Sequence, residues 1–337
     1  MSLSDHSKIA VIGECMLELN LASQPADSNR TPAVLAYGGD TLNTSIYLSR
    51  LNAKVDYVTA LGDDLMSDWM VSQWQAENVG CDHVYREPSS VPGLYMINVD
   101  EHGERSFNYW RANSPASRLF DGAKSVALFS ALEQYDYLYL SGISIAILKP
   151  EVRTKLIEFL TQYNSKGGKV IFDGNYRPNL WQSTEEAMQC YKALYSITDI
   201  ALPTLEDEQI LFEYKNAQET LDAILSFGAN EVVLKMGEDG CLYSSNSKVG
   251  FVPTKKVDVV DTTSAGDSFN AGYLSARLKG LPVIASCESG HVLASNVIQH
   301  RGAVIPKAAM PSMDLCEQAV EGSADDVTRA LNCNSLN

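Results

Sequence analysis

Short apolar runs alternate with amphipathic segments along almost the whole chain, and this alternation constrains the fold more than any other feature. Candidate strands occupy 9–12, 55–61, 137–140, 170–173, 200–202, 232–234, 241–243 and 257–260. Several of these runs are apolar throughout, as expected for parallel strands that are buried on both faces. Candidate helices occupy 41–51, 65–78, 151–164, 184–195, 217–227, 265–279 and 284–300. We therefore predict an α/β fold with a doubly wound, mostly parallel sheet flanked by helices.

Three segments near the N-terminus break this rhythm. Residues 17–21, 93–99 and 105–110 alternate polar and apolar side chains, and the last two flank a turn at 100–103. Alternation with a period of two is typical of antiparallel strands that have one exposed face. These segments therefore predict a small β-sheet that is separate from the main one.

We expect this small sheet to be a discontinuous β-lid built from about 16–37 and 92–112. It would lie over the carboxyl ends of the parallel strands, where open α/β sheets bind their ligands. The lid belongs to one domain that spans 1–320, and 321–337 form a polar tail. Because a small sheet with exposed edges is prone to pairing, we expect a homodimer or a higher homo-oligomer.

Charge and composition limit the partners. The 337 residues carry a net charge of −16, which argues against nucleic acid and against anionic membrane surfaces. An anionic substrate must then be met by basic side chains placed near it. Seven scattered cysteines without a C-x-x-C pair predict neither a zinc site nor a disulfide framework. A polar start and the lack of a long apolar run predict a cytoplasmic protein.

The segment Asp261-Thr262-Thr263-Ser264-Ala265-Gly266-Asp267 is the strongest chemical signal. Small residues and a glycine at the start of a helix leave backbone N–H groups free to bind an anion. Asp267 at the end of this turn is a carboxylate next to that anion site. Phosphoryl transfer to an alcohol needs both an anion site and a base. The alternative is an ordinary capped helix start, because Thr, Ser and Asp are good capping residues.

Two further sites support the chemical interpretation. Paired glycines at Gly38 and Gly39 allow close backbone approach, and Asp40 and Asn43 then offer hydrogen bonds to the hydroxyls of a polyol. A glycine turn with a helix cap is the alternative for this segment. The second of these two sites consists of the basic residues Arg111 and Arg177.

Arg111 follows the last alternating segment and Arg177 follows a buried strand, so both lie at strand ends. Together they could clamp a carboxylate through charge-assisted hydrogen bonds. The alternative is that each arginine is simply solvated.

Two common nucleotide-binding motifs are missing. No G-x-x-x-x-G-K-[ST] occurs, and Gly167-Gly168-Lys169 has the spacing of an ordinary helix-to-strand turn. No G-x-G-x-x-G follows the first strand, since Gly13 has no second glycine after it. The chain is therefore not a P-loop protein, and the sequence after the first strand argues against a dinucleotide-binding fold.

Gly38-Gly39 with Asn43, followed much later by Asp261 to Asp267, resembles the ribokinase-like (PfkB-type) sugar kinases. The resemblance covers 8–311 and is greatest to the members that phosphorylate the sugar acid 2-keto-3-deoxygluconate. The passages that carry it are IAVIGECMLE at 9–18, GGDTLNT at 38–44, GLY at 93–95, YWR at 109–111, YLYLSGI at 137–143, DGNYRP at 173–178 and 290–302.

This resemblance implies a Rossmann-like domain with a β-lid, ATP as phosphoryl donor and Mg²⁺ as the ion that bridges the phosphates. It implies that Asp267 is the catalytic base and that Ser264, Ala265, Gly266 and Asp267 form the anion hole. The substrate contacts that it implies are Gly39, Asp40, Thr41, Asn43, Tyr95, Tyr109, Arg111, Arg177 and Asp267. The ATP contacts that it implies are Asn175, Thr204, Lys235, Gly237, Gly240, Ser264, Ala265, Gly266 and His291.

At the expected metal sites, this sequence matches the family pattern less closely. Where the family often has Asn-x-x-Glu, this chain has Thr204 and Asp207, so Asp207 is the candidate for organising Mg²⁺. Asp261 and Thr263 match positions that hold a monovalent cation such as K⁺ in several relatives.

The expected reaction moves the γ-phosphoryl group of ATP to the terminal hydroxyl of 2-keto-3-deoxygluconate and gives 2-keto-3-deoxy-6-phosphogluconate. An aspartate with an ordinary pKa of ~3.9 is a weak base. It suffices where the transition state is largely dissociative. Two alternatives stay open: a kinase for a neutral sugar such as fructose or ribose, and a non-catalytic sugar-binding member of the fold.

Overall fold

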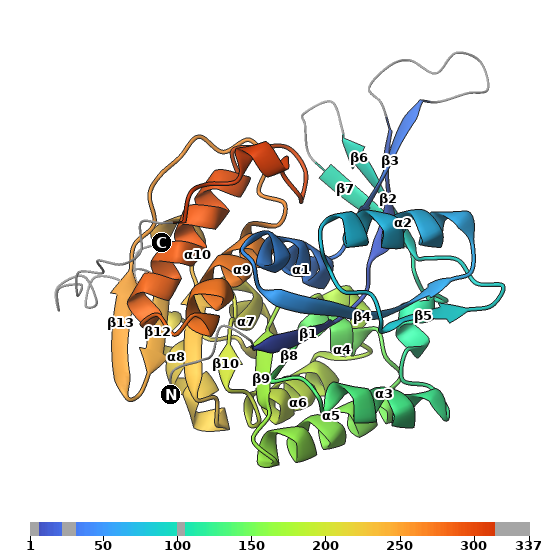
Figure 1. Ribbon diagram of the computed structural model, residues 1–337. Helices are drawn as coiled ribbons and strands as arrows, with labels where there is room; N and C mark the ends of the chain where they lie inside the picture. The colour runs from blue at the N-terminus through green and yellow to red at the C-terminus, as the bar shows by residue number, and fades with distance from the viewer. Residues whose placement is uncertain (1–6, 22–31, 100–104, 314–337) are drawn as a thin grey trace.

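A nine-stranded sheet runs through the centre of the molecule, with helices on both faces (Figure 1). The computed structural model describes residues 7–21, 32–99 and 105–313. In spatial order the strands are β13 (Lys248–Val252), β12 (Cys241–Ser245), β11 (Glu231–Lys235), β10 (Ile200–Ala201), β9 (Lys169–Asp173), β8 (Tyr137–Ser141), β1 (Lys8–Ile12), β4 (Lys54–Gly62) and β5 (Val84–Glu87). The pairs from β11 to β5 are parallel, and β12 is antiparallel to both of its neighbours. The predicted doubly wound sheet is confirmed.

Two hydrophobic cores lie on opposite faces of this sheet. Along β1, Ala10 and Ile12 belong to one core and Ile9 and Val11 to the other, because successive side chains of a strand point to opposite faces. The first core is covered by α3 (Lys124–Leu132), α4 (Gly142–Ala146), α5 (Pro150–Ser165), α6 (Thr184–Tyr195), α7 (Leu205–Phe212) and α8 (Ala217–Phe227). The second is covered by α1 (Asp40–Arg50), α2 (Leu65–Ala76), α9 (Ala265–Leu278) and α10 (Val283–Val297).

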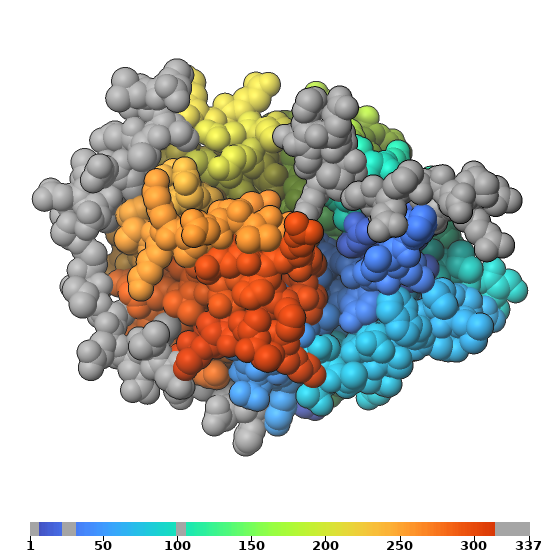
Figure 2. Space-filling model, turned by 90° about the horizontal axis from the view of Figure 1, so that it is seen from above, coloured from blue at the N-terminus to red at the C-terminus, as the bar shows by residue number. Residues whose placement is uncertain are grey.

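The second face brings the two ends of the chain together. Helices α1 and α9 pack side by side, and the segment after α10 reaches back to α1, where Tyr47 donates to the carbonyl of Ala303 at 2.8 Å. In Figure 2 the late residues, in red, lie directly beside early residues, in blue. This packing places the start of α1 next to the start of α9.

A second sheet of four strands rises beside α2 (Figure 1). Its order is β3 (Ala33–Gly38), β2 (Met16–Leu21), β6 (Leu94–Val99) and β7 (Arg105–Trp110). The hairpin of β6 and β7 has the predicted antiparallel pairing, whereas β2 runs parallel to β6. The predicted turn at 100–103 lies outside the described residues, and so does the predicted tail at 321–337. The division into one domain and a lid stays a prediction.

The predicted strand at 257–260 is wrong. This segment is irregular, and Val259 and Val260 are more than half exposed. The N–H group of Val260 donates to the carbonyl of Ile298 after α10, at 2.8 Å, and not to a neighbouring strand. Its β-branched residues gave a strand pattern without a buried place in the sheet. In the described ranges the last strand is β13, which ends earlier, at Val252.

Other expectations concern smaller features. The turn Gly167-Gly168 leads from α5 into β9, and Gly167 has a φ of 100° that favours glycine. The sequence patterns missed β3, β5, α3, α4 and α7.

None of the helices in the described ranges has the length and apolar character that a membrane span requires. The five cysteines in those ranges are free thiols, and Cys316 and Cys333 lie outside them.

Candidate active site

A cavity of about 420 Å³ opens between the small sheet and the carboxyl ends of the main strands. It is lined by the starts of α1 and α9, by the ends of β1, β9 and β11, and by residues from β6 and β7. The predicted site residues that line it are Gly39, Asp40, Asn43, Tyr95, Tyr109, Arg111, Asn175, Arg177, Thr204, Asp207, Lys235, Thr263, Ser264, Ala265, Gly266 and Asp267. Segments that are more than 200 residues apart in the sequence thus form one site.

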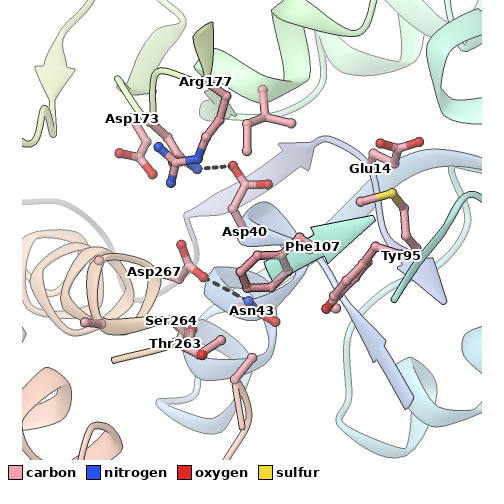
Figure 3. A pocket seen from close by; sticks show the side chains of 18 of the residues that line it. Glu14, Asp40, Asn43, Tyr95, Phe107, Asp173, Arg177, Thr263, Ser264 and Asp267 are labelled. Carbon is pink, nitrogen blue, oxygen red and sulfur yellow. Dashed lines mark hydrogen bonds between the residues drawn. The ribbon is translucent and has the colours of Figure 1, made fainter. Parts of the chain in front are cut away.

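Asp267 lies in the first turn of α9, where its carboxylate faces α1 (Figure 3). The Nδ2 of Asn43 donates to its Oδ2 at 2.9 Å. Burial raises the pKa of Asp267 to about 7, the negative charges of Asp40 and Asp173 act in the same direction, and the hydrogen bond from Asn43 opposes them. The expectation of an ordinary, weakly basic aspartate is therefore corrected, because this carboxylate is a much better base near neutral pH.

The turn before α9 is held in an anion-binding shape. Ser264 adopts a left-handed conformation, with φ 66°, immediately before the helix. The N–H group of Ala265 donates to the carbonyl of Thr262 at 3.1 Å, so it is already occupied. Within the described ranges, the N–H groups of Gly266 and Asp267 have no backbone acceptor, as is usual in the first turn of a helix. Of the four residues expected to form the anion hole, Ala265 is the one whose N–H group has a backbone acceptor in the described ranges. The anion hole itself stays a prediction.

The glycines before α1 allow a close backbone approach. A side chain on Gly39 would collide with the carbonyl oxygen of Glu14, which follows β1. This contact brings Asp40 to the cavity (Figure 3). The Oδ2 of Asp40 accepts a hydrogen bond from Asn175 Nδ2 at 2.7 Å. Burial raises the pKa of Asp40, and the charge of Asp173 adds to this. Like Asp267, Asp40 therefore has a raised pKa.

Arg111 forms an ion pair with Glu14, a residue that the sequence analysis missed. Glu14 is only 3% exposed, and burial raises its pKa against the opposing charge of Arg111. Among the described residues, Arg111 Nε and Glu14 Oε1 are buried without a hydrogen-bond partner. A donor and an acceptor thus stay available at this end of the cavity.

Arg177 faces Asp207 on α7, with Nη1 at 3.3 Å from both carboxylate oxygens. Half of the Arg177 side chain is exposed, so it can move toward a ligand. Burial raises the pKa of Asp207, Arg177 opposes this, and Asp173 adds to it. The resemblance assigns Arg177 to the substrate and Asp207 to Mg²⁺, yet the two side chains contact each other here.

The third basic residue, Lys235, pairs with Asp173 at 3.0 Å. Every basic side chain that lines the cavity is therefore held by a carboxylate in the described structure. Five acidic residues line the same cavity: Glu14, Asp40, Asp173, Asp207 and Asp267. A polyanionic ligand such as a nucleotide would need additional positive charge there.

The described part of the chain holds no cluster of three His, Cys, Asp or Glu residues placed to bind a metal ion. Mg²⁺ does not need one, because it keeps several waters and often binds through one or two carboxylates plus phosphates. Asp207 meets that requirement. The Asp261 carboxylate accepts bonds from Thr263 N and Oγ1 and from Gly302 N, so it organises the loop before α9.

Some predicted site residues do not line the cavity. The side chain of Thr41 is buried, and its hydroxyl bonds to Tyr57 at 3.1 Å, so a substrate contact by this side chain does not fit the structure. Asp261, Gly237, Gly240 and His291 are also absent from the lining. His291 Nε2 lies 3.1 Å from the carbonyl oxygen of Val252. The nucleotide contacts of Gly237, Gly240 and His291 stay a prediction.

Comparison with known proteins identifies the family. The model of a family described as "pfkB family carbohydrate kinase" matches residues 6–310. The chain belongs to this kinase family. The 2-dehydro-3-deoxygluconokinase of Escherichia coli K12 is 46% identical over 313 residues, which cover 90% of this kinase and 99% of the relative. The protein of the same name from Haemophilus influenzae is 43% identical, with 90% and 97% covered.

A solved structure gives the same fold. The PfkB protein from Polaromonas sp. JS666 has a TM-score of 0.76 and 25% identity, with 87% of this kinase and 96% of that chain covered. The predicted ribokinase-like α/β fold is therefore confirmed. Three charged or aromatic residues that line the cavity were not among the site residues predicted from the sequence of this kinase: Glu14, Phe107 and Asp173. Glu14 and Asp173 follow or end buried strands, and acidic residues at strand ends were the signal that could have found them.

Proposed function

We propose that this chain transfers the γ-phosphoryl group of ATP to the terminal hydroxyl of 2-keto-3-deoxygluconate, giving 2-keto-3-deoxy-6-phosphogluconate. The observation that carries the proposal is that Asp267, Arg111 and Arg177 line one cavity. A base and an anion site are thus combined with two basic side chains that a neutral sugar would leave unused. The names of the relatives at 43–46% identity support the same substrate.

The carboxylate of the sugar acid binds at Arg111. Its buried Nε–H group, which has no acceptor in the described residues, donates to one carboxylate oxygen. Arg177 moves from Asp207 to the other side of the substrate. The unpartnered Oδ1 of Asn43 accepts a hydrogen bond from a sugar hydroxyl. These contacts fix the sugar with its far end at Asp267.

Asp267 removes the proton of the terminal hydroxyl as the oxygen attacks the γ-phosphorus. With a pKa of about 7, a large fraction of this carboxylate is ionised at neutral pH. Asn43 holds Oδ2, which leaves Oδ1 for the substrate hydroxyl. The N–H groups of Gly266 and Asp267, together with the positive end of the α9 dipole, stabilise the charge on the phosphoryl oxygens. Loss of one such donor costs about 10²–10³ in rate.

Mg²⁺ would be held by Asp207 and the phosphates, and when bound it neutralises charge on the phosphate oxygens. A monovalent cation such as K⁺ would be held near Asp261 and Thr263. The Asp261 carboxylate also accepts three hydrogen bonds, from Thr263 N, Thr263 Oγ1 and Gly302 N.

The small sheet is the proposed surface for a homodimer. Its outer strands β3 and β7 carry exposed apolar side chains, including Val34 and Trp110, which are 62% and 57% exposed. Sedimentation analysis tests this, and a concentration-independent monomer would contradict it.

Arg111→Ala tests the substrate class. It should raise KM for 2-keto-3-deoxygluconate at least 30-fold, because a buried charge-assisted contact is lost. Phosphorylation of fructose or ribose, if present, should stay unchanged. Arg118→Ala is the matched control, because Arg118 pairs with Glu87 outside the cavity lining. Equal effects of both variants on KM would contradict the carboxylate assignment.

A further inference from the structure

The ammonium group of Lys235 is held in a closed ring of buried side chains at the base of the cavity. Lys235 Nζ lies 3.0 Å from Asp173 Oδ1 and 3.1 Å from Asn270 Oδ1. Asn270 Nδ2 donates to the hydroxyl of Tyr139 at 3.0 Å, and this hydroxyl lies 3.4 Å from Asp173 Oδ2. All four residues are less than 10% exposed. Such a ring fixes the position of the positive charge.

The ring places this charge against the anion hole. An ideal Cβ on Gly266 would lie 3.5 Å from Lys235 Nζ, so the ammonium group faces the side of Gly266 that has no side chain. Asn270 lies one helical turn after Gly266, on the same side of α9. Lys235 and Gly266 also line the same cavity. An anion bound at the N-terminus of α9 would therefore lie beside the ammonium group.

One donor of Lys235 remains for that anion. An ammonium group has three N–H bonds, and Asp173 and Asn270 take two of them. Among the described residues, no third acceptor contacts Nζ. This buried cation lies beside the first turn of α9, in a cavity that five carboxylates line.

We propose that Lys235 is a catalytic residue whose ammonium group donates its third hydrogen bond to the phosphoryl group during transfer, with Asp173 and Asn270 as positioning residues. This rests on the proposed kinase function and gives Lys235 a role beyond a general contact with the nucleotide. Because the transition state spreads negative charge over the phosphoryl oxygens, a fixed cation is worth most at that point.

The step is balanced without a change in Lys235. The bond between the γ-phosphorus and the β–γ bridging oxygen breaks, and its electron pair stays on the β-phosphate of ADP. The sugar oxygen forms the new bond to phosphorus, and its proton goes to Asp267. Lys235 forms and breaks no covalent bond in this step, and it acts through its charge and one hydrogen bond.

Lys235→Met tests the proposal, because it removes the charge and keeps the length of the side chain. We expect kcat to fall about 10²–10³-fold, with KM for the sugar acid changed less than about threefold. Affinity for ADP should change little, whereas affinity for ADP with aluminium fluoride, which mimics the transferring phosphoryl group, should fall by a factor close to that of kcat. A purely structural lysine would not produce that difference between the two ligands.

Lys169→Met is the matched control, because Lys169 also pairs with an aspartate, Asp199 at 2.8 Å, but outside this cavity. The Lys169→Met variant should have the same kcat as the wild type. If Lys235→Met does not fold because Asp173 is left unpaired, the double variant Lys235→Met with Asp173→Asn removes both charges, and the same loss of kcat is expected.

A kcat within about fivefold of wild type, in either the single or the double variant, would overturn the proposal. It would leave the kinase function standing. If the wild type does not phosphorylate 2-keto-3-deoxygluconate, the proposed function fails. The aluminium fluoride comparison still decides the role of Lys235.

Discussion

The side-chain amide of Asn43 donates a hydrogen bond to Asp267 at 2.9 Å, and this bond joins the first turns of α1 and α9. The two residues are 224 positions apart in the chain. One helix supplies the base and the other fixes one of its oxygens, so the base keeps its direction relative to the cavity. The chemistry of the site depends on the packing of the first and last thirds of the described chain.

The pH profile should show the raised pKa of Asp267. Only the ionised carboxylate can accept the proton, so kcat/KM should fall about tenfold per pH unit below about pH 7. Asp40→Asn removes a neighbouring charge that raises this pKa, so it should move the acidic limb to lower pH. Initial rates between pH 5 and 9 check both results, and a flat profile down to pH 5 would rule out this base.

Asp267→Asn should abolish transfer and stabilise the fold at alkaline pH. The pKa of Asp267 is higher in the folded than in the unfolded chain, so the folded state binds more protons between about pH 4 and 7, and stability declines across this window. The amide cannot ionise, so its gain should reach on the order of 4 kcal/mol at pH 8 and vanish near pH 4. Urea unfolding at both pH values measures this. An equal gain in stability at pH 4 and at pH 8 would argue against a raised pKa of Asp267.

Glu14→Ala should raise KM for the sugar acid about tenfold and leave kcat within about threefold. The ion pair with Glu14 holds the guanidinium of Arg111 in the cavity, and without it the arginine loses its fixed position. Steady-state kinetics distinguish this from a catalytic effect. A fall in kcat at unchanged KM would place Glu14 in the chemical step instead.

Gly39→Ala should destabilise the protein by about 2–4 kcal/mol, because its Cβ would collide with the carbonyl oxygen of Glu14. Gly122→Asn is the control: this exposed glycine has φ 68° and no atom within 4 Å of its Cβ position, and Asn tolerates that conformation. Thermal unfolding should show a large decrease in melting temperature for Gly39→Ala and little change for Gly122→Asn.

Local patterns predicted the α/β sheet and the positions of Asp267 and Gly39, because strand periodicity, glycine pairs and helix starts are properties of adjacent residues. They missed Glu14, and Lys235 received a general nucleotide contact only through the family resemblance, because the partners of these residues come from distant elements. The pKa of Asp267 could not be predicted for the same reason, since it depends on burial and on Asp40 and Asp173. The segment 257–260 failed as a strand because apolar composition alone does not provide a neighbouring strand.

The most direct test of the central claim measures ADP release by purified wild-type protein with 2-keto-3-deoxygluconate, fructose and ribose, together with Asp267→Asn. Mass spectrometry of the product gives the position of the new phosphate. We predict one ADP per molecule of 6-phosphorylated sugar acid, little turnover of the neutral sugars and none by the variant. Faster turnover of fructose or ribose, or full activity of Asp267→Asn, would contradict the claim.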